Sequence, residues 1–122
     1  MCTCFSDIYA QAGSVDSIAA LVEKGDKYRR ILPDSAMMYF QQALAIAYPL
    51  YESDTFRDNE DAWLENAAFI IRAETLSGHI FYNDCKYGLA MEHYQNALAV
   101  AQLAENRFEV DESIFNIGEI YL

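Results

Sequence analysis

A twelve-residue segment that occurs twice constrains the fold of this chain more than any other feature of its sequence. Residues 36–47 read AMMYFQQALAIA, and residues 90–101 read AMEHYQNALAVA. Both copies place an aromatic residue, Phe40 or Tyr94, four residues after the first alanine and three before another alanine. Small and aromatic residues at these spacings share one face of a helix. The repetition therefore predicts stacked helical units, because internal repeats on this scale are typical of repeat architectures.

Composition and charge narrow the class of protein. The chain has 122 residues, of which 53% are hydrophobic, and it contains only two prolines and five glycines. This composition favours one ordered, helical domain over disorder. The net charge of −11 argues against direct nucleic-acid binding, because phosphate contacts need clustered lysine and arginine. No segment has the roughly 20 apolar residues that a membrane-spanning helix needs.

The hydrophobic periodicity predicts five helices. The first covers residues 14–31, with Ser14 as its N-cap, and a break follows at residues 32–35. The second ends or kinks near Pro49, because proline clashes with a continuing helical turn. A polar loop is expected at residues 52–59, followed by helices at 60–82 and 86–105 and by a last helix from about residue 110 to the end of the chain.

The pattern resembles the tetratricopeptide repeat (TPR) family, which stacks 34-residue helix–turn–helix units. The second helix of the family motif carries a small residue, an aromatic residue and an alanine, which match Ala36, Phe40 and Ala43, then Ala90, Tyr94 and Ala97. The first helix carries a large residue, a Leu-Gly pair and an aromatic residue, which match Ile114, Ile117, Gly118 and Tyr121 fully, Ser77, Gly78 and Phe81 in part, and Lys24, Gly25 and Tyr28 more weakly.

The resemblance implies an all-α fold: a right-handed superhelical stack of antiparallel helix pairs, a TPR-like α-solenoid of about two and a half repeats. The repeat domain would cover residues 14–122 and belong to a longer protein. The spacing departs from the family, because the two second-helix copies begin 54 residues apart, at positions 36 and 90, rather than 34. A lengthened third helix and a longer loop before it would explain the difference.

The resemblance also implies a non-catalytic scaffold that binds a protein or peptide segment on its concave face, with no cofactor. Carried over position by position, the family's binding residues correspond to Arg29, Arg30, Arg72, Thr75, His79, Tyr82, Asn83, Glu112, Phe115 and Glu119. Arg72, Thr75, His79 and Tyr82 lie at spacings of three and four, so they form one stripe on one helix. The alternative interpretation is that they are the polar side of a packed helix.

Two other functions are compatible with the sequence. A metal or small-molecule site would require His79, Asp84, Cys85 and His93 to converge around one turn, although no pair among them has a usual ligand spacing. A homodimer would use the last helix, whose apolar residues need cover: Ile114, Phe115, Ile117, Ile120 and Tyr121.

The first thirteen residues form a separate segment, interpreted as a signal-peptide remnant or as a disordered or helical N-terminus. Ala10, Gln11 and Ala12 before Gly13 match the small-x-small pattern of a cleavage site. One hypothesis is therefore the sensing region of an exported or membrane-bound bacterial signalling protein, and the other is a cytoplasmic protein. Cys2 and Cys4 would leave with a cleaved signal, and Cys-x-Cys alone is a poor zinc signature.

Overall fold

A computed structural model of the chain describes the backbone of residues 3–121 and the side chains of residues 15–121. This part of the chain contains no strand and consists of six helices: α1 (Thr3–Tyr28), α2 (Pro33–Tyr51), α3 (Asp54–Arg57), α4 (Glu60–Asn83), α5 (Tyr87–Leu103) and α6 (Arg107–Tyr121). The all-α prediction is thus confirmed. The predictions on Cys2, Cys4 and the 10–12 segment concern side chains outside the described residues.

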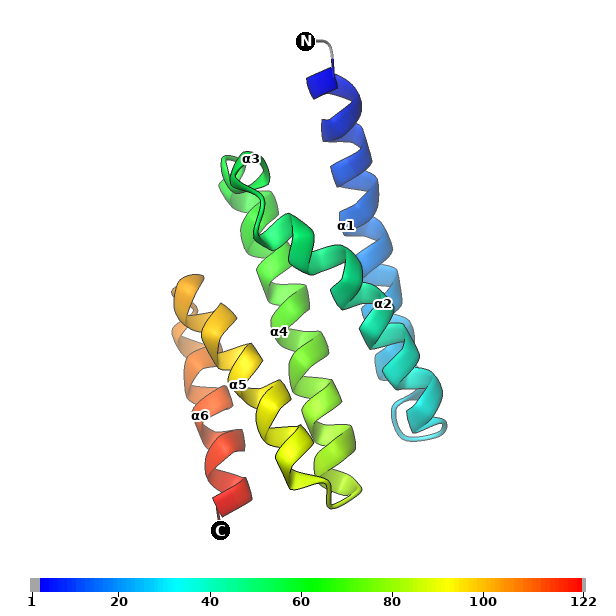
Figure 1. The fold of residues 1–122 in the computed structure, drawn as a ribbon, viewed down its shortest axis with the longest axis vertical. Helices are drawn as coiled ribbons and strands as arrows, with labels where there is room; N and C mark the ends of the chain where they lie inside the picture. The colour runs from blue at the N-terminus through cyan, green and yellow to red at the C-terminus, as the bar shows by residue number, and fades with distance from the viewer. Residues whose placement is uncertain (1–2, 122) are drawn as a thin grey trace.

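Helices that follow one another in the chain lie side by side. Figure 1 shows α1 with α2 and α4 with α5 as two hairpins, whose short turns lie toward the same end of the molecule. Helix α2 also packs against α4, and α5 packs against α6. Helix α1 contacts α4 directly, so the first helices of the two hairpins share one side of the molecule.

The two copies of the repeated segment lie on α2 and α5 and turn the same face inward. Each of their matched small and aromatic residues is at most 2% exposed: Ala36, Phe40, Ala43, Ala90, Tyr94 and Ala97. The core also contains Ile18 and Val22 from α1 and Trp63, Ile70 and Ile71 from α4. The burial of this apolar surface is the main force that holds the helices together.

Two glycines allow the aromatic rings of the repeat to approach a neighbouring helix closely. A Cβ added at Gly25 of α1 would lie 2.7 Å from Cδ1 of Phe40, and one added at Gly78 of α4 would lie 2.6 Å from Cδ1 of Tyr94. Real Cβ atoms do not approach ring carbons so closely. The same contact therefore occurs in both hairpins, and in both it requires glycine.

Helix α2 ends at Tyr51, two residues after Pro49, in agreement with the expected end near this proline. Pro49 lies in the last turn, where its missing N–H removes a single backbone hydrogen bond. The side chain of Trp63 donates from Nε1 to the Tyr51 carbonyl at 3.0 Å, which satisfies an acceptor that a helix end leaves open. Nearby, Asn66 donates from Nδ2 to the Ala47 carbonyl at 2.9 Å.

Two boundaries differ from the sequence prediction. Helix α1 begins at Thr3, well before Ser14. The expected loop at 52–59 contains the short helix α3, because Ser53 caps it by accepting a hydrogen bond from the Phe56 N–H at 3.2 Å. Phe56 is 4% exposed, so its burial anchors this otherwise polar segment.

The turns after α4 and α5 share one geometry. Cys85 and Glu105 have positive φ, 60° and 56°, and the N–H of the residue after each returns to a carbonyl in the last helical turn. Lys86 donates to Phe81 at 2.8 Å, and Asn106 donates to Ala101 at 3.0 Å. Glycine usually fills this left-handed position, so both turns hold a less favoured residue.

Candidate binding surface

An open hollow lies between α4, α5, α6 and the turn after α1. It is lined by Arg29 from this turn, His79, Tyr82 and Asn83 from α4, Tyr94 from α5, and Phe115, Asn116 and Glu119 from α6. Six of the ten residues predicted for partner binding are in this set. Its volume is about 290 Å³, at the lower limit of the pockets that hold drug-sized ligands. The hollow therefore suits one or two side chains of a larger partner.

His79 and Tyr94 form the floor of this hollow. The Tyr94 hydroxyl lies 2.7 Å from Nδ1 of His79, and the two rings meet edge to face at 5.5 Å. Burial, followed by the charge of Arg29, lowers the pKa of His79, while Glu112 opposes the shift. Burial raises the pKa of Tyr94 to about 12. Neutral His79 and the protonated Tyr94 hydroxyl therefore share a hydrogen bond at neutral pH.

The rim of the hollow carries charge of both signs. Arg29 lies on the α1 side, and its Nε is 3.3 Å from Oδ1 of Asp26. Glu119 lies on the α6 side, beside Phe115, which is 63% exposed. The hollow thus presents a cation, a carboxylate and an aromatic surface to solvent.

Arg72 does not line the hollow. Its Nη2 lies 2.8 Å from Oδ2 of Asp26, so the ion pair joins α4 to α1. The Arg72 side chain is 47% exposed, and such surface pairs contribute at most about 1 kcal/mol. Thr75 is half-buried and Glu112 is exposed, and neither lines the hollow. Of the predicted stripe of four residues, only His79 and Tyr82 therefore line the hollow.

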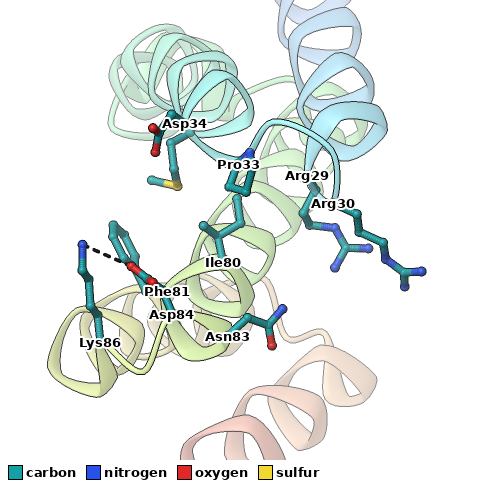
Figure 2. Close-up of a pocket in the computed structure, with 10 residues that line it drawn as sticks. Arg29, Arg30, Pro33, Asp34, Ile80, Phe81, Asn83, Asp84 and Lys86 are labelled. Atoms are coloured by element: carbon teal, nitrogen blue, oxygen red, sulfur yellow. Dashed lines mark ion pairs between the residues drawn. The ribbon is translucent and has the colours of Figure 1, made fainter.

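A second hollow, of about 520 Å³, lies between the turns of the two hairpins. Its lining comprises Arg29, Arg30, Pro33, Asp34, Met37, Ile80, Phe81, Asn83, Asp84 and Lys86. Figure 2 shows Ile80 between Pro33 and the α4 ribbon. Arg29 and Arg30 lie on one side of Ile80, and Lys86 lies on the other. The Lys86 Nζ lies 3.2 Å from Oδ2 of Asp84, which neutralises that side. Arg29 and Asn83 belong to both hollows, so the two are adjacent.

The residues of the alternative metal site do not come together. His79 faces Tyr94, whereas His93 stacks on Phe81 with ring centroids 5.4 Å apart, and Cys85 is exposed in its turn. Among the described residues, no group of three histidine, cysteine, aspartate or glutamate side chains is placed to hold a metal ion. The sequence spacing, which contains no usual ligand pair, already pointed away from such a site.

Sequence reasoning missed a buried polar group on the other side of α4. Glu74 is 2% exposed, and its Oε1 lies 3.4 Å from Nδ1 of His93. Burial, followed by the Glu74 carboxylate, raises the pKa of Tyr48. Three helices, α2, α4 and α5, thus contribute polar groups to one cluster around the buried Glu74. The position of Glu74 among apolar residues of α4 was the available signal.

No protein-family model, curated protein or solved structure matches the chain. Among the described residues, no helix combines the length and the apolar character that crossing a membrane requires.

Proposed function

We propose that this protein is a non-catalytic interaction scaffold of the TPR type, which binds a peptide or protein segment in the hollow lined by α4, α5, α6 and the turn after α1. The packing order supports the proposed superhelical stack, because each helix of a hairpin contacts its partner and the second helix of one hairpin contacts the first helix of the next. The repeated contact of an aromatic ring with a glycine supports it further. In such stacks the first helices form a continuous inner surface for ligands.

The observation that carries the proposal is the convergence of side chains from three separate helices in one open hollow. Arg29, His79 and Phe115 lie 50 and 36 residues apart in the sequence, in the turn after α1, on α4 and on α6. The mixture of an aromatic surface with charged and amide groups is typical of the polar, aromatic-rich character of protein interfaces.

The chemistry of the hollow suggests what kind of segment it holds. Phe115 and Tyr82 offer aromatic surface, Arg29 and Asn83 offer hydrogen-bond donors, and Glu119 offers an acceptor. An extended segment with one apolar side chain, whose backbone carbonyls meet the donors, fits this arrangement. The net charge of −11 favours the approach of partners with a basic surface.

Selection from a displayed peptide library on the folded chain tests the proposal. We expect peptides enriched in an aromatic or aliphatic residue, and NMR titration of the selected peptide should shift the backbone signals of Arg29, His79, Tyr82 and Asn83. Phe115→Ala should weaken binding about tenfold or more, because aromatic anchors dominate such interfaces.

Phe108→Ala is the matched control, because Phe108 lies on the same helix and is 69% exposed but does not line the hollow. If both substitutions reduce affinity equally, or if the titration shifts cluster elsewhere, the hollow is not the binding site.

A further inference from the structure

The second hollow, between the turns of the two hairpins, carries an excess of positive charge although the whole chain has a net charge of −11. Three of its lining residues are basic and two are acidic. Lys86 and Asp84 pair with each other at 3.2 Å, so their charges cancel. The excess therefore comes from Arg29 and Arg30, which lie in the turn after α1.

Neighbouring carboxylates do not neutralise these two arginines. Nε of Arg29 lies 3.3 Å from Oδ1 of Asp26, but Arg72 lies 2.8 Å from the other oxygen of the same carboxylate. One carboxylate thus faces two guanidinium groups. Arg30 is exposed, and it forms no ion pair with any residue that the structure describes. An unpaired guanidinium group can hold a carboxylate or a phosphate through two parallel hydrogen bonds.

The floor of the second hollow is apolar. It consists of the half-buried side chains of Met37 from α2 and of Ile80 and Phe81 from α4. Met37 and Ile80 also pack against the core, so the fold holds them in place. An apolar group that lies on this floor is removed from water, which favours its binding. The flexible side chain of methionine can adapt to the shape of such a group.

Charged side chains lie at both ends of this apolar floor. Figure 2 shows Arg29 and Arg30 on one side of Ile80, and Asp34 and Lys86 on the other. The floor is therefore short, and it suits a short apolar body. The volume of the hollow, about 520 Å³, lies within the range of small-molecule sites, roughly 300–1,000 Å³.

We propose that the second hollow binds a small organic acid, whose carboxylate meets Arg29 and Arg30 and whose short apolar body lies on the apolar floor. The excess of one positive charge matches a carboxylate, because a phosphate group carries about −1.5 to −2 at pH 7. The site goes beyond the proposed function. Arg30, Met37 and Ile80 do not line the first hollow, which contains His79, so the two sites can be tested separately.

The probe is 3-phenylpropanoate, which joins a carboxylate to a short apolar body. We expect it to shift the methyl NMR signals of Met37 and Ile80 in the 122-residue protein, with a Kd on the order of 1 mM for so small a ligand. The uncharged amide of the same shape, 3-phenylpropanamide, should bind at least about tenfold more weakly, because it loses the charge-assisted hydrogen bonds. Acetate, which has the charge without the apolar body, should give no saturable shift at millimolar concentration.

Two variants of the protein locate the binding. Arg30→Gln removes an unpaired charge from an exposed position, so the protein stays folded. It should weaken the binding of 3-phenylpropanoate at least about tenfold and abolish the preference over the amide. Lys27→Gln is the matched control, because it removes the same charge three residues earlier, from an exposed side chain that lines neither hollow. Circular dichroism checks that both variants are folded.

Several results would overturn the proposal. Equal affinity for the acid and the amide would show that the arginines do not bind the carboxylate. An equal loss in Arg30→Gln and Lys27→Gln would show an effect of overall charge, and the absence of saturable shifts at tens of millimolar probe would show that no site exists. Tighter binding of N-acetylphenylalanine than of 3-phenylpropanoate would assign the hollow to the end of a peptide chain instead of a small acid.

Discussion

Substitution of Gly78 tests the close approach of α4 and α5. Gly78→Ala places a Cβ 2.6 Å from Cδ1 and 3.0 Å from Cζ of the Tyr94 ring. The ring has little room to move, because Tyr94 is 2% exposed and its hydroxyl is held 2.7 Å from His79 Nδ1. Relief of the clash therefore requires α5 to shift away from α4.

The expected loss of stability follows from two opposing effects. Overpacking a core typically costs about 1–3 kcal/mol, and more where the neighbours cannot move. Alanine in place of glycine within a helix restores about 1 kcal/mol through its higher helix propensity. We therefore expect Gly78→Ala to lower the free energy of unfolding by about 1–2 kcal/mol. The Tm should fall by several degrees, at about 3–6 °C per kcal/mol for a domain of this size.

Gly118→Ala is the matched control for this experiment. It makes the same change in a corresponding helix, but its Cβ meets nothing within 4 Å, so only the propensity gain of up to about 1 kcal/mol remains. Urea unfolding, followed by circular dichroism at 222 nm, should show opposite signs for the two variants. Equal effects of the two substitutions would refute the argument that Gly78 is required by the ring of Tyr94.

Other substitutions test individual elements. Because the folded state holds the pKa of His79 below its unfolded value, the unfolded chain takes up the proton first. Stability should fall as the pH drops below about 6.5, and His79→Gln should flatten this dependence in urea midpoints. Glu105→Gly should raise the free energy of unfolding by about 0.5–1 kcal/mol, and with it the Tm, because glycine adopts the left-handed φ of 56° without strain. An unchanged Tm would argue against strain at this residue. Ala97→Glu buries a charge at a position that is 0% exposed and should cost about 3 kcal/mol or more in thermal unfolding, whereas exposed Ala99→Glu should be tolerated.

The sequence predicted the helices most reliably where local physical rules act alone. Residues 60–82 and 86–105 were expected as helices, and α4 and α5 lie at Glu60–Asn83 and Tyr87–Leu103. The boundaries that differ are the start of α1 at Thr3 and the short helix α3 inside the expected loop. Helix α2 ends two residues after Pro49, as expected, but its end is also held by Trp63, twelve residues away, through the Tyr51 carbonyl. Periodicity cannot reveal a hydrogen bond of this kind.

The candidate site shows the same division. The resemblance to the repeat family selected Arg29, His79 and Phe115, and the structure brings these three residues together around one hollow. The sequence could not predict that Arg72 of α4 pairs with Asp26 of α1. Whether two side chains on different helices meet depends on how the helices pack. Tyr94 was recognised only as a core position, although its hydroxyl reaches the hollow.

The amino-acid sequence alone determined that the chain is helical, that its two repeated faces are buried and that glycine and aromatic residues recur in register. These properties follow from spacing along one helix, which the chain carries locally. Only the tertiary structure decided which glycines lie under a ring and which one is open. That outcome depends on whether another helix is present within contact distance, and Gly25, Gly78 and Gly118 are alike in sequence but differ in this respect.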